Sequence, residues 1–152
     1  MLLTIDLDSD KIENGTGVQF VCWRIGWRRE NVRDIQDYAM KYQEDPCEKY
    51  QVRYRREKIM ELMSSCRHET VLEIGCGMEP LFEYVKDYSK MVIVEPGDVF
   101  IQNARKKAQE SGSNVVCIQG FLEEKTQQAK EACHDYDFIV LSSLLHEVDE
   151  PE

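Results

Sequence analysis

The sequence predicts an α/β fold in which a buried parallel sheet carries helices on both faces, preceded by a helical N-terminal extension. Short runs of Val, Ile and Leu recur after residue 70, segments with helical spacing separate them, and the first run ends in a glycine turn. Near-continuous apolar runs of this kind are typical of parallel strands that are buried on both faces. The chain has 152 residues, of which 42% are hydrophobic, and this is enough for one core.

Residues 1–69 are interpreted as an extension or lid. Apolar and polar residues alternate in 3–7 and 18–22 around a glycine-containing turn, which predicts a β-hairpin. Apolar residues at three- and four-residue steps then predict helices over 31–43 and 48–64. The apolar stripe of the second helix consists of Val52, Ile59, Leu62 and Met63.

Residues 70–152 predict a second unit in which strands and helices alternate. Strands are expected at 71–74, 91–94, 114–118 and 137–141, and helices at 80–88, 98–110 and 123–133. Pro80 suits the first turn of a helix because its missing N–H would have no partner there. Asp98 is expected to cap the next helix. We therefore expect βαβ units and a single parallel sheet.

Charge and hydropathy exclude several classes of partner. The formal net charge is −10, and the basic stretches at 24–33 and 49–58 are interleaved with acids, so we expect solvated helix faces and no nucleic-acid partner. No apolar stretch is long enough to span a membrane, and the first fifteen residues carry acids where a signal peptide needs an apolar run. We expect a cytoplasmic chain without membrane contact.

Six cysteines are spread along the chain without any C-x-x-C pair. Outside a dense framework in a small secreted domain, such cysteines are expected to be reduced. Their spacing also offers no set of zinc ligands, so we expect no metal site.

The strongest chemical signal is the segment 71–77, VLEIGCG, in which a strand runs into a turn containing Gly75 and Gly77. Glycines let a backbone approach a ligand closely, which predicts a Rossmann-like cofactor site. A dinucleotide site would use a third glycine where this chain has Pro80, and this disfavours the alternative of an NAD(P)-dependent oxidoreductase. Glu73, two residues before the first glycine, would repel a pyrophosphate but suits a ligand with ammonium and sulfonium charges.

The second signal is the acid that ends the next strand, Glu95, which Pro96 follows. It lies about 20 residues beyond the glycines, where a carboxylate can accept hydrogen bonds from both ribose hydroxyls. Glu95 is therefore the leading single candidate for a binding residue.

At these residues the sequence resembles the class I S-adenosylmethionine-dependent methyltransferases, whose first motif is an acidic strand end followed by G-x-G. The resemblance covers about 70–150 and implies S-adenosyl-L-methionine as the cofactor. It also implies that the methionine part of the cofactor is surrounded by Glu73, Gly75, Cys76 and Gly77. The family usually has another glycine at the position of Glu79.

Two later segments fit the same resemblance. After the third strand come Gly120, Phe121 and Leu122, where many relatives have an acid that binds the adenine amino group, and Phe121 or Leu122 is expected to pack on the adenine instead. After the fourth strand, Ser142 would lie beside the sulfur of the cofactor. His146 would lie just outside, where an imidazole can take a proton from the acceptor during methyl transfer.

The resemblance implies a methyltransferase that acts on a small-molecule acceptor. A full class I fold has seven strands, whereas the sequence stops after the fourth, so strand 137–141 is expected to form an uncovered apolar edge. Either the chain is truncated, or a partner chain or dimer mate covers that edge, and we favour truncation with little or no turnover. The alternative function is a non-catalytic module that binds a cofactor or a partner.

Overall fold

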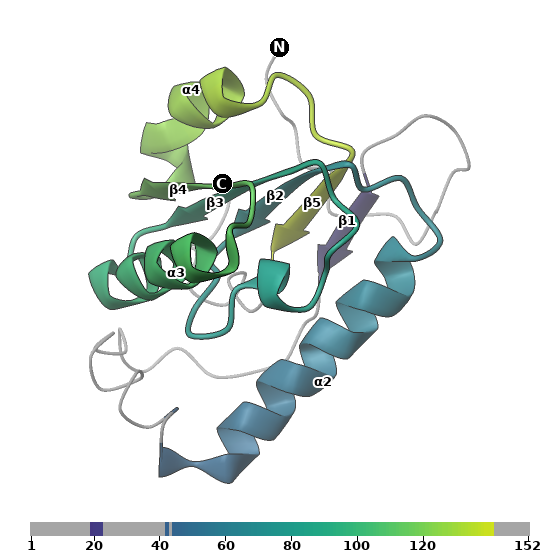
Figure 1. The fold of residues 1–152 in the computed structure, drawn as a ribbon, viewed down its shortest axis with the longest axis vertical. Helices are drawn as coiled ribbons and strands as arrows, with labels where there is room; N and C mark the ends of the chain where they lie inside the picture. The colour runs from purple at the N-terminus through teal and green to yellow at the C-terminus, as the bar shows by residue number, and fades with distance from the viewer. Residues whose placement is uncertain (1–18, 23–41, 43, 142–152) are drawn as a thin grey trace, which may run out of the picture.

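The computed structural model describes residues 19–22, 42 and 44–141, which form a Rossmann-like α/β fold (Figure 1). The elements in chain order are β1 (Gln19–Cys22), α2 (Pro46–Met63), β2 (Thr70–Ile74), the 3₁₀ helix η1 (Leu81–Glu83), β3 (Lys90–Glu95), α3 (Asp98–Ser111), β4 (Val115–Gln119), α4 (Leu122–Ala132) and β5 (Phe138–Leu141). The predicted fold class is confirmed, and the four strands predicted after residue 70 are present.

The five strands pair in parallel in the order β1-β5-β2-β3-β4. The chain leaves β2 on one side to form β3 and β4, and then crosses back to place β5 on the other side of β2. The carboxyl ends of β2 and β5 therefore form the topological switch point, the place where open α/β sheets bind their ligands.

β5 is not an edge strand, contrary to the expectation for 137–141. Residues 19–22 of β1 lie beside 138–141 in parallel register. An apolar strand without a neighbour leaves its backbone N–H and C=O groups unpaired, and β1 supplies partners for them from within the chain. The second strand of the predicted hairpin, 18–22, is present as β1, which pairs with β5. The other half of that hairpin, 3–7, lies outside the described residues.

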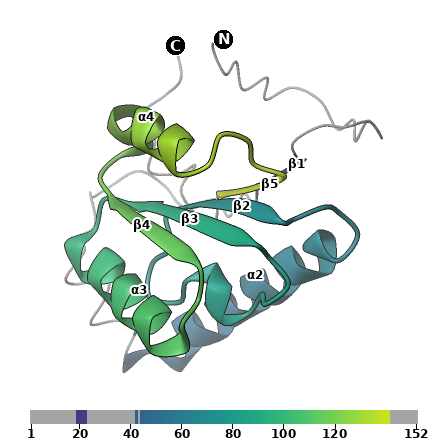
Figure 2. The same ribbon diagram turned by 45° about the horizontal axis from the view of Figure 1, so that its top comes forward.

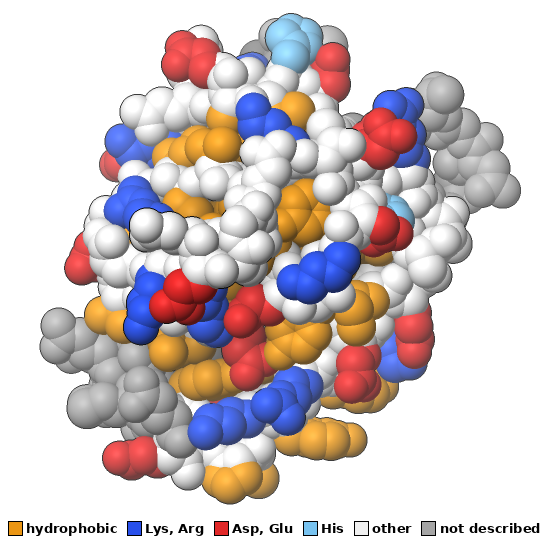
Figure 3. All heavy atoms as spheres, in the orientation of Figure 1, with side chains coloured by type: hydrophobic (Ala, Val, Ile, Leu, Met, Phe, Trp, Pro, Cys, Tyr) orange, Lys and Arg blue, Asp and Glu red, His pale blue; other side chains and the backbone are white. Residues whose placement is uncertain are grey.

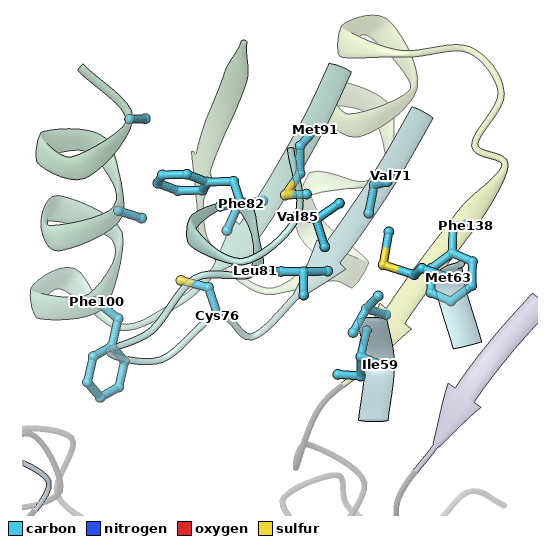
Figure 4. Close-up of a cluster of buried hydrophobic side chains, with 14 of the residues drawn as sticks. Ile59, Met63, Val71, Cys76, Leu81, Phe82, Val85, Met91, Phe100 and Phe138 are labelled. Atoms are coloured by element: carbon cyan, nitrogen blue, oxygen red, sulfur yellow. The ribbon is translucent and has the colours of Figure 1, made fainter. Parts of the chain in front are cut away.

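Helices cover both faces of the sheet, as predicted (Figure 2). Because side chains alternate along a strand, odd-numbered residues of β2 and β3 face α2 and α3, and even-numbered ones face α4. The first face builds the larger core cluster, whose members include Ile59, Met63, Val71, Leu81, Phe82, Met91, Ile93 and Phe138 (Figure 4). The second face packs Leu72, Ile74, Val92 and Val94 near Ala129 of α4.

Two local expectations are corrected. The helix expected over 80–88 is shortened to the 3₁₀ turn Leu81–Glu83. Leu81 and Phe82 reach the core from this turn, and Val85 reaches it from two residues beyond. The backbone then returns to the sheet, where the amide nitrogens of Ser89 and Lys90 donate to the Glu69 carbonyl. At α3 the capping residue is Gly97, and Asp98 is the first helical residue.

The helix expected over 31–43 lies outside the described residues except for Tyr42. No helix among the described segments is long and apolar enough to cross a membrane. On the face drawn in Figure 3, Lys and Arg side chains are interspersed with Asp and Glu.

Candidate functional site

The turn after β2 lies at the carboxyl edge of the sheet, beside the switch point. Gly75 and Gly77 both have left-handed backbone angles, with φ of 74° and 58°. The amide nitrogen of Gly75 donates to the Val94 carbonyl at 2.9 Å, which ties the turn to β3. Among the described residues, no atom lies within 4 Å of a Cβ placed on Gly77, so that side of Gly77 faces open space. A flat group of a ligand can approach the backbone there.

Glu95, the last residue of β3, lies against this turn. Its Oε1 accepts from the amide nitrogen of Gly97 at 2.8 Å, and its Oε2 accepts from that of Gly77 at 3.2 Å. Burial raises the pKa of the Glu95 carboxyl, and the two N–H groups oppose that shift. Glu95 is 5% exposed, and a carboxylate has about four acceptor positions, so the positions that the amides leave can accept ligand hydroxyls only through this small opening.

Glu73 lies on the same face of the sheet as Glu95, but beneath the turn. Its side chain has no exposed surface, and its Oε1 lies 2.8 Å from Nη2 of Arg56. Its Oε2 accepts from the amide nitrogen of Leu81 at 2.9 Å. Burial raises the pKa of Glu73, and the positive charge of Arg56 opposes this. The charge expected to face a cofactor is thus neutralised inside the protein, which leaves Glu95 as the carboxylate at the edge.

Cys76 points into the protein. Its side chain belongs to the larger core cluster, and 2% of the residue is exposed (Figure 4). Burial and the neighbouring carboxylates of Glu73 and Glu95 raise the pKa of the thiol. Cys76 can therefore contact a ligand only through its backbone.

The end of β4 completes the edge. The amide nitrogen of Gly120 donates to the Glu95 carbonyl at 3.1 Å, which joins the candidates after β4 to those after β3. Phe121, which precedes α4, is 59% exposed. Leu122 instead packs against the smaller core cluster. Of the two residues expected to stack on adenine, Phe121 is the one that presents its ring to solvent. Pro96 is half-buried beside Glu95.

Sequence reasoning missed Arg56, which it placed on a solvated helix face. Only 3% of Arg56 is exposed. The spacing contains a signal for it, because Val52, Arg56, Ile59 and Met63 recur at helical steps and are the buried residues of α2. Leu62, predicted in that stripe, is 40% exposed.

Glu79, at the position where the resembling family has a glycine, takes part in a second polar group. Its carboxylate accepts hydrogen bonds from the hydroxyls of Tyr42 and Tyr84. Burial and the Glu79 charge raise the pKa of both tyrosines. These contacts hold the side chain of Glu79 within the protein.

Ser142 and His146 lie outside the described residues, so the acceptor side of the predicted site has no structural description. Among the residues that are described, no group of three His, Cys, Asp or Glu side chains could hold a metal ion.

The fold and the edge define a Rossmann-like α/β protein whose glycine turn and strand-end carboxylate meet beside the switch point. Comparison with protein-family models, with curated proteins and with solved structures found no match for this chain.

Proposed function

We propose that this chain binds S-adenosyl-L-methionine at the carboxyl edge of its sheet and is the cofactor-binding part of a methyltransferase for a small-molecule acceptor. One observation carries the proposal. The carboxylate of Glu95 is fixed by the amide nitrogens of Gly77 and Gly97, directly beside an open glycine turn. The cofactor would supply the methyl group.

The side chains at this edge fit an adenosyl group. The free acceptor positions of Glu95 suit the two ribose hydroxyls. The exposed ring of Phe121 offers an apolar surface for a purine, next to Gly120, whose amide nitrogen binds the Glu95 carbonyl. Pro80 stands where a dinucleotide site would have its third glycine, and this weighs against a nicotinamide dinucleotide.

A non-catalytic binding module is the second candidate, and a specific observation favours it. Arg56 neutralises Glu73 beneath the turn, so the carboxylate expected to face the sulfonium is turned inward. The ribose of a ligand could still bind the carboxylate of Glu95, whereas the electrostatic attraction between Glu73 and the methyl-bearing sulfonium is reduced. Such a site would bind nucleosides, including the demethylated product, without methyl transfer.

Thermal denaturation with S-adenosylhomocysteine tests the binding step. We expect this ligand to raise the Tm of the wild type and to leave that of Glu95→Ala unchanged, because a ligand that binds only the folded state stabilises it. Glu110→Ala is the matched control, since Glu110 is 63% exposed near the end of α3, and it should respond as the wild type does.

Two comparisons separate the candidates. A Tm that rises with NADH and not with S-adenosylhomocysteine would contradict the proposal. If S-adenosylhomocysteine binds, incubation with methyl-labelled S-adenosylmethionine and a panel of small acceptors distinguishes an enzyme from a binding module. Label in an acceptor supports the enzyme, and binding without any transfer supports the module.

A further inference from the structure

Beneath the glycine turn, one buried side chain of α2 reaches several groups of the segment that follows β2. Arg56 donates from Nε to the Glu79 carbonyl and from Nη2 to the Cys76 carbonyl, each at 2.9 Å. The same Nη2 lies 2.8 Å from Oε1 of Glu73. A planar guanidinium with several fixed donors can hold separate acceptors in this way.

Glu73, the ion-pair partner of Arg56, binds the end of the same segment at Leu81. Its second carboxylate oxygen accepts from the amide nitrogen of Leu81 at 2.9 Å. Residues 76, 79 and 81 are therefore held from below by one pair of side chains, which are 3% and 0% exposed. The upper side of the same segment carries the open backbone of Gly77 and its hydrogen bond to Glu95.

The pair is poorly arranged for stability alone. Among the described residues, Nη1 of Arg56 has no hydrogen-bond partner, although the pair is almost wholly buried. Desolvation makes a buried ion pair a weak net stabiliser compared with apolar side chains of similar size. The more specific effect of this pair is on the conformation of the backbone that it binds.

We propose that Arg56 is a positioning residue of the ligand site, which with Glu73 holds 76–81 in the shape that leaves Gly77 open and directs its amide nitrogen at Glu95. The role in ligand binding rests on the function proposed above. Through this contact α2, which lies outside the segment resembling a methyltransferase, sets the affinity of the edge for its ligand.

Three variants test the proposal. Arg56→Lys keeps a positive charge beside Glu73 but loses the fork that reaches two carbonyls. Arg56→Met/Glu73→Leu removes both buried charges together, so that neither is left unpaired. Lys58→Met/Glu61→Leu is the matched control, because it removes another ion pair from α2 whose members are 33% and 65% exposed.

Amide hydrogen exchange of the unliganded proteins gives the first readout. We expect exchange in 76–81 to be about tenfold faster in Arg56→Lys and in the double variant, with the amides of β3 and α3 unchanged. The control should exchange as the wild type does. If the double variant does not fold, Arg56→Lys alone decides the result.

Calorimetric titration with S-adenosylhomocysteine gives the second readout. We expect Kd to rise about tenfold in the Arg56 variants and to stay the same in the control. The positioning role would be overturned if 76–81 exchanged in the variants at the wild-type rate, or if exchange became equally faster throughout the protein. An unchanged Kd in the variants would also overturn it. No binding by the wild type would contradict the proposed function, whereas the exchange experiment would still decide whether Arg56 holds the segment.

Discussion

The amide nitrogen of Gly77 lies 3.2 Å from Oε2 of Glu95, so the turn after β2 and the end of β3 form one hydrogen-bonded unit. Gly77 can present its N–H in this direction because its φ of 58° is in the left-handed region. The turn and the carboxylate depend on each other, since the N–H partly offsets the burial of the charge.

Gly77→Ala should weaken ligand binding, whereas Gly112→Ala should not. Both glycines have left-handed φ, and in the described part of the chain no atom lies within 4 Å of an added Cβ. Each substitution should therefore lower the free energy of unfolding by about 1–2 kcal/mol through backbone strain alone. Urea denaturation measures this cost. Calorimetry with S-adenosylhomocysteine should detect a loss only for Gly77→Ala, and equal affinities would place the ligand elsewhere.

Ligand affinity should fall as the pH is lowered through the pKa of Glu95. Burial raises that pKa above its ordinary value of 4.5, and the protonated carboxyl loses acceptor positions for ribose hydroxyls. Titrations with S-adenosylhomocysteine from neutral pH down to the ordinary pKa of 4.5 should show this loss in the wild type. Glu95→Gln should bind weakly at every pH, and a wild-type affinity independent of pH would remove Glu95 from the site.

Protein stability should respond to Glu95 in the opposite sense. A folded pKa that lies above the unfolded value means that folding favours the protonated carboxyl. The stabilising contribution is complete below the unfolded pKa and is lost as the pH rises through the folded pKa. Urea denaturation of wild type and Glu95→Gln across that range should show the wild type losing stability relative to the variant as the pH rises. A constant difference would contradict the raised pKa.

Phe121→Ala should weaken binding without unfolding the protein. The residue is 59% exposed, so little packing is lost, but a purine would lose its apolar contact. We expect Kd for S-adenosylhomocysteine to rise about tenfold, which corresponds to about 1.4 kcal/mol, with Tm unchanged. Leu62→Ala, at a 40% exposed position on α2, is the control that should change neither quantity.

The sequence indicated most of the sheet and part of the site. Apolar runs predicted the four strands after residue 70, and the glycines and Glu95 were expected at one edge, where the structure has them joined through the Gly75, Gly77 and Gly120 amides. The prediction that Glu73 contacts the cofactor rested on its position beside the glycines. Whether it faces outward depended on Arg56, which lies 17 residues earlier on another element.

The helix over 80–88 shows a similar limit. Apolar spacing indicated that Leu81, Phe82 and Val85 lie on one side, and all three are buried. A 3₁₀ turn at 81–83 followed by irregular backbone at 85 meets that requirement as well as a longer helix does, so the pattern could not set the length of the element. The length was set by the return of the backbone to β3, where the amide nitrogens of Ser89 and Lys90 donate to the Glu69 carbonyl.

The sequence by itself determined the strands, the parallel fold class and the glycine turn, because apolar periodicity and the freedom of glycine act over a few neighbouring residues. Only the tertiary structure decided that β1 lies beside β5, that Arg56 is buried and that Glu73 turns inward. These outcomes depend on contacts between segments that are distant in the sequence. Whether a carboxylate faces solvent, or a strand lies at the edge of a sheet, is decided by the residues that pack against it in the folded chain.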